Sequence, residues 1–419
     1  MDKFEYKNGT LYCENARVGD IAEKVGTPLY IYSRATIEHH YKQIEEAFRG
    51  TSTLICYSIK ANGNLALLRI MKDLGAGFDA VSGGEIYRAL AIGADPKKIV
   101  FAGVGKTDEE IRYALQAGIL MFNVESREEM ENIDRIALEM GRVAPMVLRV
   151  NPDVDPKTHT YITTGKAENK FGIDLLSTEE IVAEIPRLKN LQLLGFHCHI
   201  GSQITDIEPY NFAMRRMMDL FQKCRKSYPI QYLNIGGGFG IYYKGDEARP
   251  VREFAQQIMP FVEATKCRLI LEPGRFIVGN AGILVTRVQY IKKSGPKRFV
   301  ICDAGMNDLI RPTLYQAYHR IWPVTTDLPL NAPGRELSPA DVVGPICESG
   351  DYFARDRALP EMHRGDLMVI FSAGAYGFTM SSNYNSRPKP PEVLVEGNNW
   401  RVVRKRETYE DLVKDETER

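Results

Sequence analysis

The sequence lacks any apolar run that approaches the ~18 residues needed to span a membrane. It also lacks a surplus of charge, because 54 Lys and Arg residues stand against 54 Asp and Glu residues. A general nucleic-acid-binding or polybasic membrane role needs a positive surplus and is therefore disfavoured. The N-terminal residues are polar and contain no apolar core of a secretory signal. We therefore expect a cytoplasmic protein.

Cysteine is scarce: seven residues are scattered along 419 positions, and none forms a CxxC pair. Neither a disulfide framework nor a zinc cluster is indicated. Internal repeats and low-complexity segments are also absent. Hydrophobic residues make up 44% of the chain and charged residues 26%, which is typical of a globular protein. The length predicts two to three domains.

Short apolar strands alternate with helical stretches between residues 34 and 280. We expect strands at 53–60, 77–82, 99–103, 121–126, 145–151, 193–201, 232–237 and 268–274. Such alternation is typical of a parallel sheet buried on both faces, and eight units favour a closed (β/α)8 TIM barrel over an open doubly wound sheet. Capping-box pairs predict three helix starts: Thr107 with Glu110, Ser126 with Glu129, and Ser177 with Glu180.

The helical alternation stops after the eighth strand, and residues 281–419 contain mostly strand-like runs. We expect a second, mostly β domain there, a β-barrel or sandwich. Two short strands flank Asn8-Gly9, a strong hairpin signal, and another strand is expected at 28–33. A closed barrel offers a hairpin no edge to pair with. Residues 1–33 are therefore expected to join the β domain.

Functional residues of such barrels collect where strands end. Lys60 closes the first strand, where a partly desolvated amine suits Schiff-base chemistry; a lysine reaching into solvent is the alternative. His197 and His199 share one face at the end of the sixth strand, and Ser202 follows them. No further ligand follows at metal-binding spacing, so we expect no metal, and an imidazole here can stack on a flat ring.

A glycine run, Gly236–Gly240, follows the seventh strand, where backbone N–H groups can bind a phosphate; a tight turn is the alternative. Glu272 closes the eighth strand and could keep a ring nitrogen protonated, and Arg275 could clamp a carboxylate. A surface Glu–Arg pair is the alternative. A lysine, a stacking histidine, a phosphate loop and a carboxylate together match the needs of pyridoxal 5′-phosphate (PLP).

Several motifs between residues 10 and 400 resemble those of a known enzyme family. The Lys60 strand end, HIGS (199–202), the glycine run and EPGR (272–275) resemble the PLP-dependent ornithine and arginine decarboxylases of the alanine-racemase-like group. Four more motifs resemble its diaminopimelate decarboxylase branch: HTYITTGKAENKFGI (159–173), LIRPTLYQAYH (309–319), GPICESGD (344–351) and GAYGFTMSSNYNSRP (374–388).

The resemblance implies a role for each matching residue. Lys60 would carry the cofactor, His199 would stack on its ring, Glu272 would hold the ring nitrogen, and Cys347 would be the catalytic acid. Further cofactor contacts would come from Asp79, Ser202, Gly237, Gly238, Gly240, Gly274, Arg275 and Tyr376. Substrate contacts would come from Arg275, Arg311, Tyr315, Glu348 and Tyr376.

The resemblance also implies a homodimer, in which Cys347 and Glu348 enter the partner subunit's active site, and an active-site cover formed by residues 152–172. The implied reaction converts meso-2,6-diaminopimelate to L-lysine and CO2, the last step of lysine biosynthesis. Arg275 and Arg311 would be poorly compensated by substrates without a far carboxylate, which gives a physical basis for selectivity.

Three alternatives stay open on the residues alone. The first is a related decarboxylase acting on ornithine, arginine or carboxynorspermidine. The second is a non-catalytic PLP-binding barrel protein, against which about 140 motif-bearing residues after the barrel argue. The third is a barrel hydrolase or aldolase that uses a lysine without any cofactor.

Overall fold

The computed structural model describes residues 2–154, 170–245, 248–330, 333 and 336–416. The chain divides into two compact units. Residues 40–241 and 247–276 form one, and residues 1–39, 242–246 and 277–419 form the other. The boundaries expected from the sequence, at 33/34 and 280/281, stay predictions.

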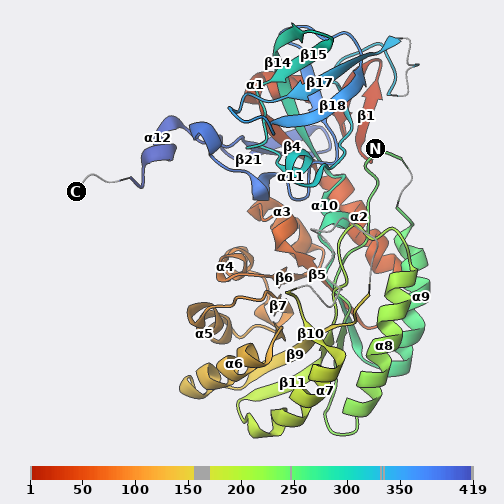
Figure 1. Ribbon diagram of the computed structural model, residues 1–419, viewed down its shortest axis with the longest axis vertical. Coiled ribbons are helices and arrows are strands. Elements are labelled where there is room, and N and C mark those ends of the chain that lie inside the picture. Colours follow the sequence, from red (N-terminus) through yellow and green to blue (C-terminus); the bar gives the residue numbers. More distant parts are fainter. Residues whose placement is uncertain (1, 155–169, 246–247, 331–332, 334–335, 417–419) are drawn as a thin grey trace. The chain divides into compact units, whose positions relative to one another are not determined.

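The first unit is a closed barrel of eight parallel strands, as expected (Figure 1). Neighbouring strands pair in the order β5-β6-β7-β8-β9-β11-β12-β13, and β13 pairs with β5 to close the ring. The short β10 (Ile173–Asp174) extends β9. The barrel strands are β5 (Thr53–Ser58), β6 (Gly77–Ala80), β7 (Ile99–Phe101), β8 (Met121–Val124), β9 (Ala144–Asn151), β11 (Leu191–His197), β12 (Tyr232–Asn234) and β13 (Arg268–Leu271).

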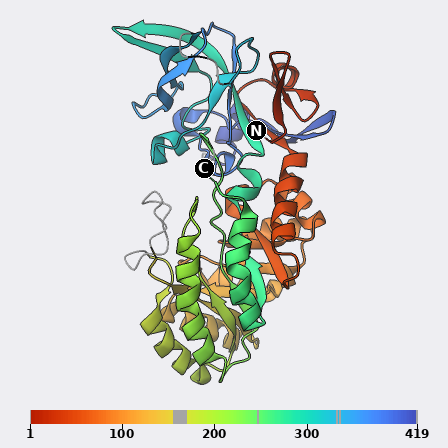
Figure 2. The same ribbon diagram turned by 90° about the vertical axis from the view of Figure 1, so that its right-hand side faces the viewer.

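Helices follow the strands and cover the outside of the barrel (Figures 1 and 2). In Figure 2, α8 and α9 lie side by side, in agreement with their contacts. The helices are α3 (Leu65–Asp73), α4 (Gly83–Ala91), α5 (Asp108–Ala117), α6 (Arg127–Glu139), α7 (Leu175–Glu184), α8 (Glu208–Cys224), α9 (Val251–Thr265) and the short α10 (Arg275–Val278), which begins in this unit.

Two of the three predicted helix caps are present. Thr107 and Glu110 form a full capping box, and the Ser126 side chain accepts from Glu129 N. The prediction for Ser177 was wrong: α7 begins at Leu175, and Asp174 caps it by accepting from Ser177 N. Asp174 and Ser177 are three residues apart, and an aspartate caps a helix as well as a serine does. The helix therefore begins after the earlier of the two, Asp174.

The barrel interior changes from apolar to polar along the strands. Its core consists of Leu54, Cys56, Val100, Met121, Val147, Leu194 and Ile270. Polar side chains replace apolar ones where the strands end: Asp79, Asn123, Asn234 and Glu272 are all buried. Burial of these groups requires hydrogen-bonded partners, and each of the four makes at least one hydrogen bond inside the barrel.

The second unit is mostly β, as expected. Its main sheet has the order β18-β17-β15-β14-β4-β20-β21, and β19 pairs with both β14 and β16. The strand β4 comes from the N-terminal segment and lies between β14 and β20. These strands are β4 (Leu29–Ser33), β14 (Gly282–Ser294), β15 (Lys297–Cys302), β16 (Ile321–Pro323), β17 (Ser338–Val343), β18 (Tyr352–Leu359), β19 (Leu367–Ile370), β20 (Glu392–Glu396) and β21 (Asn399–Arg404).

The hairpin expected at Asn8-Gly9 is present. It pairs β1 (Phe4–Lys7) with β2 (Thr10–Cys13), and both turn residues have positive φ, +49° and +74°. The strand β3 (Ala16–Arg17) completes this small sheet. The remaining helices are α1 (Val18–Val25), α2 (Arg34–Ala47), α11 (Arg311–Tyr315) and α12 (Tyr409–Val413).

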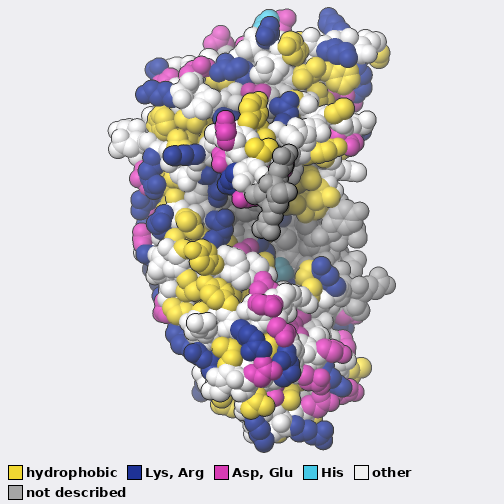
Figure 3. Space-filling model, turned by 90° about the vertical axis from the view of Figure 1, so that its left-hand side faces the viewer, with side chains coloured by type: hydrophobic (Ala, Val, Ile, Leu, Met, Phe, Trp, Pro, Cys, Tyr) yellow, Lys and Arg dark blue, Asp and Glu magenta, His cyan; other side chains and the backbone are white. Residues whose placement is uncertain are grey.

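The surface carries charges of both signs. Figure 3 faces the side of helices α4 to α6, and Lys/Arg and Asp/Glu side chains are interspersed there. Arg135 on α6 lies 2.6 Å from Asp108 and 2.5 Å from Glu139. Among the described residues, no helix combines the length and the hydropathy that crossing a membrane requires.

Candidate active site

Lys60 lies immediately beyond β5, in a single helical turn over Ile59–Ala61. Its Nζ donates to Asp79 Oδ2 at 2.6 Å, and Ser58 Oγ donates to the same oxygen at 2.6 Å. Burial raises the pKa of Asp79, and the ammonium of Lys60 opposes that rise. The lysine side chain is 35% exposed, whereas the Asp79 side chain is fully buried. The amine is therefore anchored from below by a buried carboxyl group and remains accessible from solvent.

Glu272 follows β13 and is the centre of a buried polar cluster. Its Oε1 accepts from Asn123 Nδ2 at 3.0 Å and from Asn234 Nδ2 at 2.6 Å. His197 Nε2 lies 3.3 Å from Oε2. Burial by itself would raise the pKa of Glu272, but His197, Lys60 and Asn234 outweigh that effect and hold the pKa well below its usual range. The carboxylate is therefore ionised, and about one of its four acceptor positions remains available.

His199 is held against the glycine run. Its Nδ1 accepts from Gly237 N at 3.2 Å, which places any ring proton on Nε2. Burial, together with the positive charges of Arg149 and Lys60, lowers the pKa of His199 well below its usual range. His199 is thus a neutral ring with a fixed orientation, as a stacking role requires.

The glycine run forms a tightly packed loop after β12. Gly238 has φ +107°, and a Cβ there would lie 2.6 Å from Gly201 O. Its carbonyl accepts from Ile204 N at 2.8 Å, so the run pairs with the segment that follows Ser202. Gly274 is equally constrained, because a Cβ there would lie 2.9 Å from Ala61 Cβ, next to Lys60.

Ser202 and Arg275 meet beside this loop. Arg275 Nη2 donates to Ser202 Oγ at 3.0 Å, and the arginine is buried. Through these contacts the barrel brings Lys60, Asp79, Glu272 and His199 to the same end of the barrel as Ser202 and Arg275.

The other predicted residues belong to the β unit. Arg311 begins α11 and is buried, and Tyr315 ends this helix half-buried. Cys347 and Glu348 are exposed, and Cys347 N donates to Asn385 Oδ1 at 2.7 Å. Tyr376 is half-buried with φ +55°, a conformation that non-glycine residues rarely adopt. Most of the predicted cover, residues 155–169, lies outside the described residues.

Sequence reasoning missed the amides that hold Glu272. Asn123 lies near the carboxyl end of β8, and Asn234 is the last residue of β12. Each places a buried amide in an otherwise apolar strand. That interruption is the signal that could have revealed them. The sequence offered a metal ligand or a stacking ring as roles for the two histidines, and it did not predict that His197 lies against Glu272. Among the described residues, no group of three or more His, Cys, Asp or Glu side chains is placed to hold a metal ion.

These groups fit PLP. Gly274, where a Cβ would meet Ala61, lies next to Lys60, and the buried Glu272 carboxylate accepts hydrogen bonds from two amides. The Asp79 Oδ1 atom is buried without a hydrogen-bond partner among the described residues, as expected where a polar group of a ligand completes a site.

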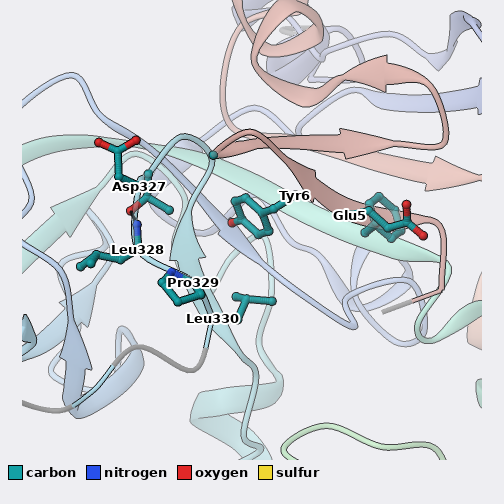
Figure 4. Close-up of a pocket in the computed structure, with 9 residues that line it drawn as sticks. Glu5, Tyr6, Asp327, Leu328, Pro329 and Leu330 are labelled. Carbon is teal, nitrogen blue, oxygen red and sulfur yellow. Dashed lines mark hydrogen bonds between the residues drawn. The ribbon is translucent and has the colours of Figure 1, made fainter.

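A separate cavity of about 520 Å³ lies in the β unit. Figure 4 shows the side chains of Tyr6, Pro329 and Leu330 along it, and Glu5 and Asp327 are its charged lining residues. Among the residues that the structure describes, its lining contains no lysine, histidine or cysteine.

The fold and the site define a barrel-type, pyridoxal-dependent decarboxylase. Residues 34–279 match the family "Pyridoxal-dependent decarboxylase, pyridoxal binding domain". The chain is 48% identical to a diaminopimelate decarboxylase of Aquifex aeolicus, with 98% of this chain and 96% of that protein covered. The crystal structure of the Helicobacter pylori diaminopimelate decarboxylase complexed with L-lysine is 42% identical, with a TM-score of 0.90 and coverage of 94% of this chain and 98% of that one.

A diaminopimelate decarboxylase structure from M. jannaschii aligns with a TM-score of 0.93 at 38% identity, covering 100% of this chain and 98% of that one. The chain belongs to the diaminopimelate decarboxylase family, and its cofactor is PLP.

Proposed function

We propose that this chain converts meso-2,6-diaminopimelate to L-lysine and CO2, with Lys60 carrying the cofactor and Cys347 returning the proton. The observation that carries the proposal is the buried Glu272 carboxylate, which accepts from two asparagine amides at the same barrel end as the Lys60 amine. The names of the close relatives and the L-lysine held by one of them support the choice of substrate.

The residues of the barrel have separate tasks. When bound, PLP supplies an aldehyde for an amine and a ring that accepts the electron pair left by the departing carboxyl group. Glu272 keeps the ring nitrogen protonated, because its own low pKa makes the ion pair more stable than the neutral pair. Asp79, 2.6 Å from Lys60 Nζ, is the group placed to take up a proton from that amine. His199 supplies a flat neutral ring, while Ser202, Gly237, Gly238, Gly240, Gly274 and Arg275 bind the phosphate end.

The β unit supplies the groups for the substrate. Arg311 and Tyr315, together with Arg275, bind the far carboxylate, Glu348 binds the far ammonium, and Tyr376 contacts both cofactor and substrate. Arg311 is buried, so a substrate that leaves its charge without a carboxylate partner binds with a less favourable free energy. Selectivity for a substrate with two amino-acid ends follows from this arrangement.

Cys347 acts as the acid in a homodimer, where Cys347 and Glu348 complete the partner's site. All seven cysteines are free thiols, and Cys347 is the exposed one. Exposure of Cys347 and Glu348 in the single chain supports a role in a second subunit. The enzyme is proposed to work in the cytoplasm.

The proposal is tested by measuring CO2 release from meso-diaminopimelate, ornithine, arginine and carboxynorspermidine. We expect rapid release from meso-diaminopimelate, with kcat/KM at least ~10²-fold above the others, since unpaired buried charges discriminate strongly. Preference for ornithine or arginine would assign a related decarboxylase. Bound cofactor without turnover of any amino acid would indicate a non-catalytic PLP protein, and a colourless protein that binds no PLP would contradict the cofactor itself.

A further inference from the structure

The guanidinium of Arg311 is joined to a buried histidine. Arg311 Nη1 lies 2.9 Å from His319 Nε2, and His319 Nδ1 lies 2.8 Å from the backbone oxygen of Phe371. His319 has 0% and Arg311 has 6% of its surface exposed. A chain of two hydrogen bonds therefore connects the first residue of α11 to the backbone just after β19.

The chemistry of the two partners determines where the imidazole proton lies. An arginine can only donate, so His319 Nε2 must accept and carry no hydrogen. A carbonyl oxygen can only accept, so the proton must be on His319 Nδ1. His319 is therefore a neutral imidazole in a single tautomer, and it acts as a hydrogen-bond acceptor toward a cation.

A third side chain restrains the same guanidinium. Arg311 Cζ lies 4.8 Å from the centre of the Tyr243 ring, and that ring meets His319 edge-on at 5.4 Å and 79°. The guanidinium is thus covered on one face by an aromatic ring and held at one nitrogen by an imidazole. Together these two contacts fix both the position and the plane of the Arg311 guanidinium group.

We propose that His319 is a positioning residue, which orients Arg311 for the far carboxylate of the substrate; this inference rests on the proposed function. An arginine that is already ordered loses little conformational freedom when it binds a carboxylate. Bidentate binding also requires the guanidinium plane to be oriented toward both carboxylate oxygens. His319 therefore acts on substrate affinity through Arg311, without contact with the reacting atoms.

Two substitutions separate the two hydrogen bonds. His319→Asn places an amide donor near the Nδ1 position, which preserves the bond to Phe371 O and removes the acceptor for Arg311. His319→Gln places an amide oxygen near the Nε2 position, which preserves the acceptor and removes the bond to Phe371 O. A purely structural role predicts similar damage in both variants, whereas a positioning role predicts damage mainly in His319→Asn.

The readouts are the Kd for L-lysine, measured by calorimetry, and the kcat and KM for meso-diaminopimelate. Losing a hydrogen bond to a charged group corresponds to roughly 10- to 100-fold in affinity. We expect His319→Asn to weaken L-lysine binding and raise KM by about 10-fold or more, with kcat changed by less than about 3-fold. His319→Gln should restore most of the affinity. In an Arg311→Ala background, His319→Asn should cause no further loss.

Equal losses in His319→Asn and His319→Gln, or a further loss in the Arg311→Ala background, would overturn the inference. A wild-type chain that neither binds L-lysine nor decarboxylates meso-diaminopimelate would instead overturn the proposed function. Nitrogen NMR of the histidine-labelled wild-type protein requires no stable variant. A neutral His319 with its proton on Nδ1 is expected, and a proton on Nε2 would refute the arrangement.

Discussion

Replacement of Asn234 by alanine tests how the barrel keeps Glu272 ionised. The Asn234 side chain donates to Glu272 Oε1 at 2.6 Å, and its Oδ1 accepts from Gly236 N at 2.9 Å. A hydrogen bond to a charged group contributes about 1.5–3 kcal/mol and a neutral one about 1 kcal/mol. We therefore expect the free energy of unfolding to fall by about 2.5–4 kcal/mol at pH 7, and the pKa of Glu272 to rise.

The pH dependence of this loss has a defined sign. The folded-state pKa of Glu272 is depressed, so its contribution to stability is complete above the unfolded pKa near ~4.3 and disappears as the pH falls through the folded value. Asn234→Ala raises the folded pKa. The difference in the free energy of unfolding between wild type and Asn234→Ala is therefore largest at neutral pH. It becomes smaller as the pH falls through the raised pKa of Glu272 in the variant.

The assay is urea unfolding at pH 7 and at successively lower pH, followed by circular dichroism. Asn132→Ala is the matched control, because Asn132 Nδ2 also donates to a carboxylate, Asp108, at 2.9 Å, but on the half-exposed face of α6. Asn132→Ala should lower the free energy of unfolding by less than about 0.5 kcal/mol. The reasoning is refuted if Asn234→Ala costs no more than the control, or if its cost is the same at acidic pH.

Three further substitutions test the site. Lys60→Ala should abolish both the visible absorbance of the bound cofactor and turnover; a variant that keeps either would contradict the assignment. Cys347→Ala should slow turnover at least ~10-fold, typical of a lost acid, while the cofactor stays bound, and unchanged kinetics would argue against that role. Gly238→Ala should weaken PLP binding by ~10-fold or more, because φ is +107° and the new Cβ would lie 2.6 Å from Gly201 O. Gly141→Ala, with φ +61° and open space around it, controls for backbone strain alone.

Much of the barrel could be predicted, because its strands are buried on both faces and read as short apolar runs separated by helices. Lys60, Ser202, the glycine run and Glu272 follow such runs directly, so their location at one end required only the topology. The position of β4 between β14 and β20 could not be predicted in this way. Pairing between strands hundreds of residues apart leaves no local pattern.

The partners of the predicted residues were harder to find. Arg275 was expected to clamp a carboxylate, and the structure shows its guanidinium on Ser202 Oγ at 3.0 Å. Asn123 lies one residue before the end of β8 and Asn234 ends β12, and both amides reach Glu272 only because the two strands belong to the same barrel. The contact between Arg311 and His319 depends on how the chain leaves α11 at its C-cap residue Gln316, which has φ +52°. Such contacts are set by three-dimensional packing, to which sequence spacing gives no access.

The most direct test of the account is the identity of the lysine that binds the cofactor. The protein is loaded with PLP, reduced with borohydride, digested and mapped by mass spectrometry. We predict a pyridoxyl-phosphate group on the peptide that contains Lys60 and on no other peptide. Modification of a different lysine, or a fully loaded protein with an unmodified Lys60 peptide, would contradict the central claim.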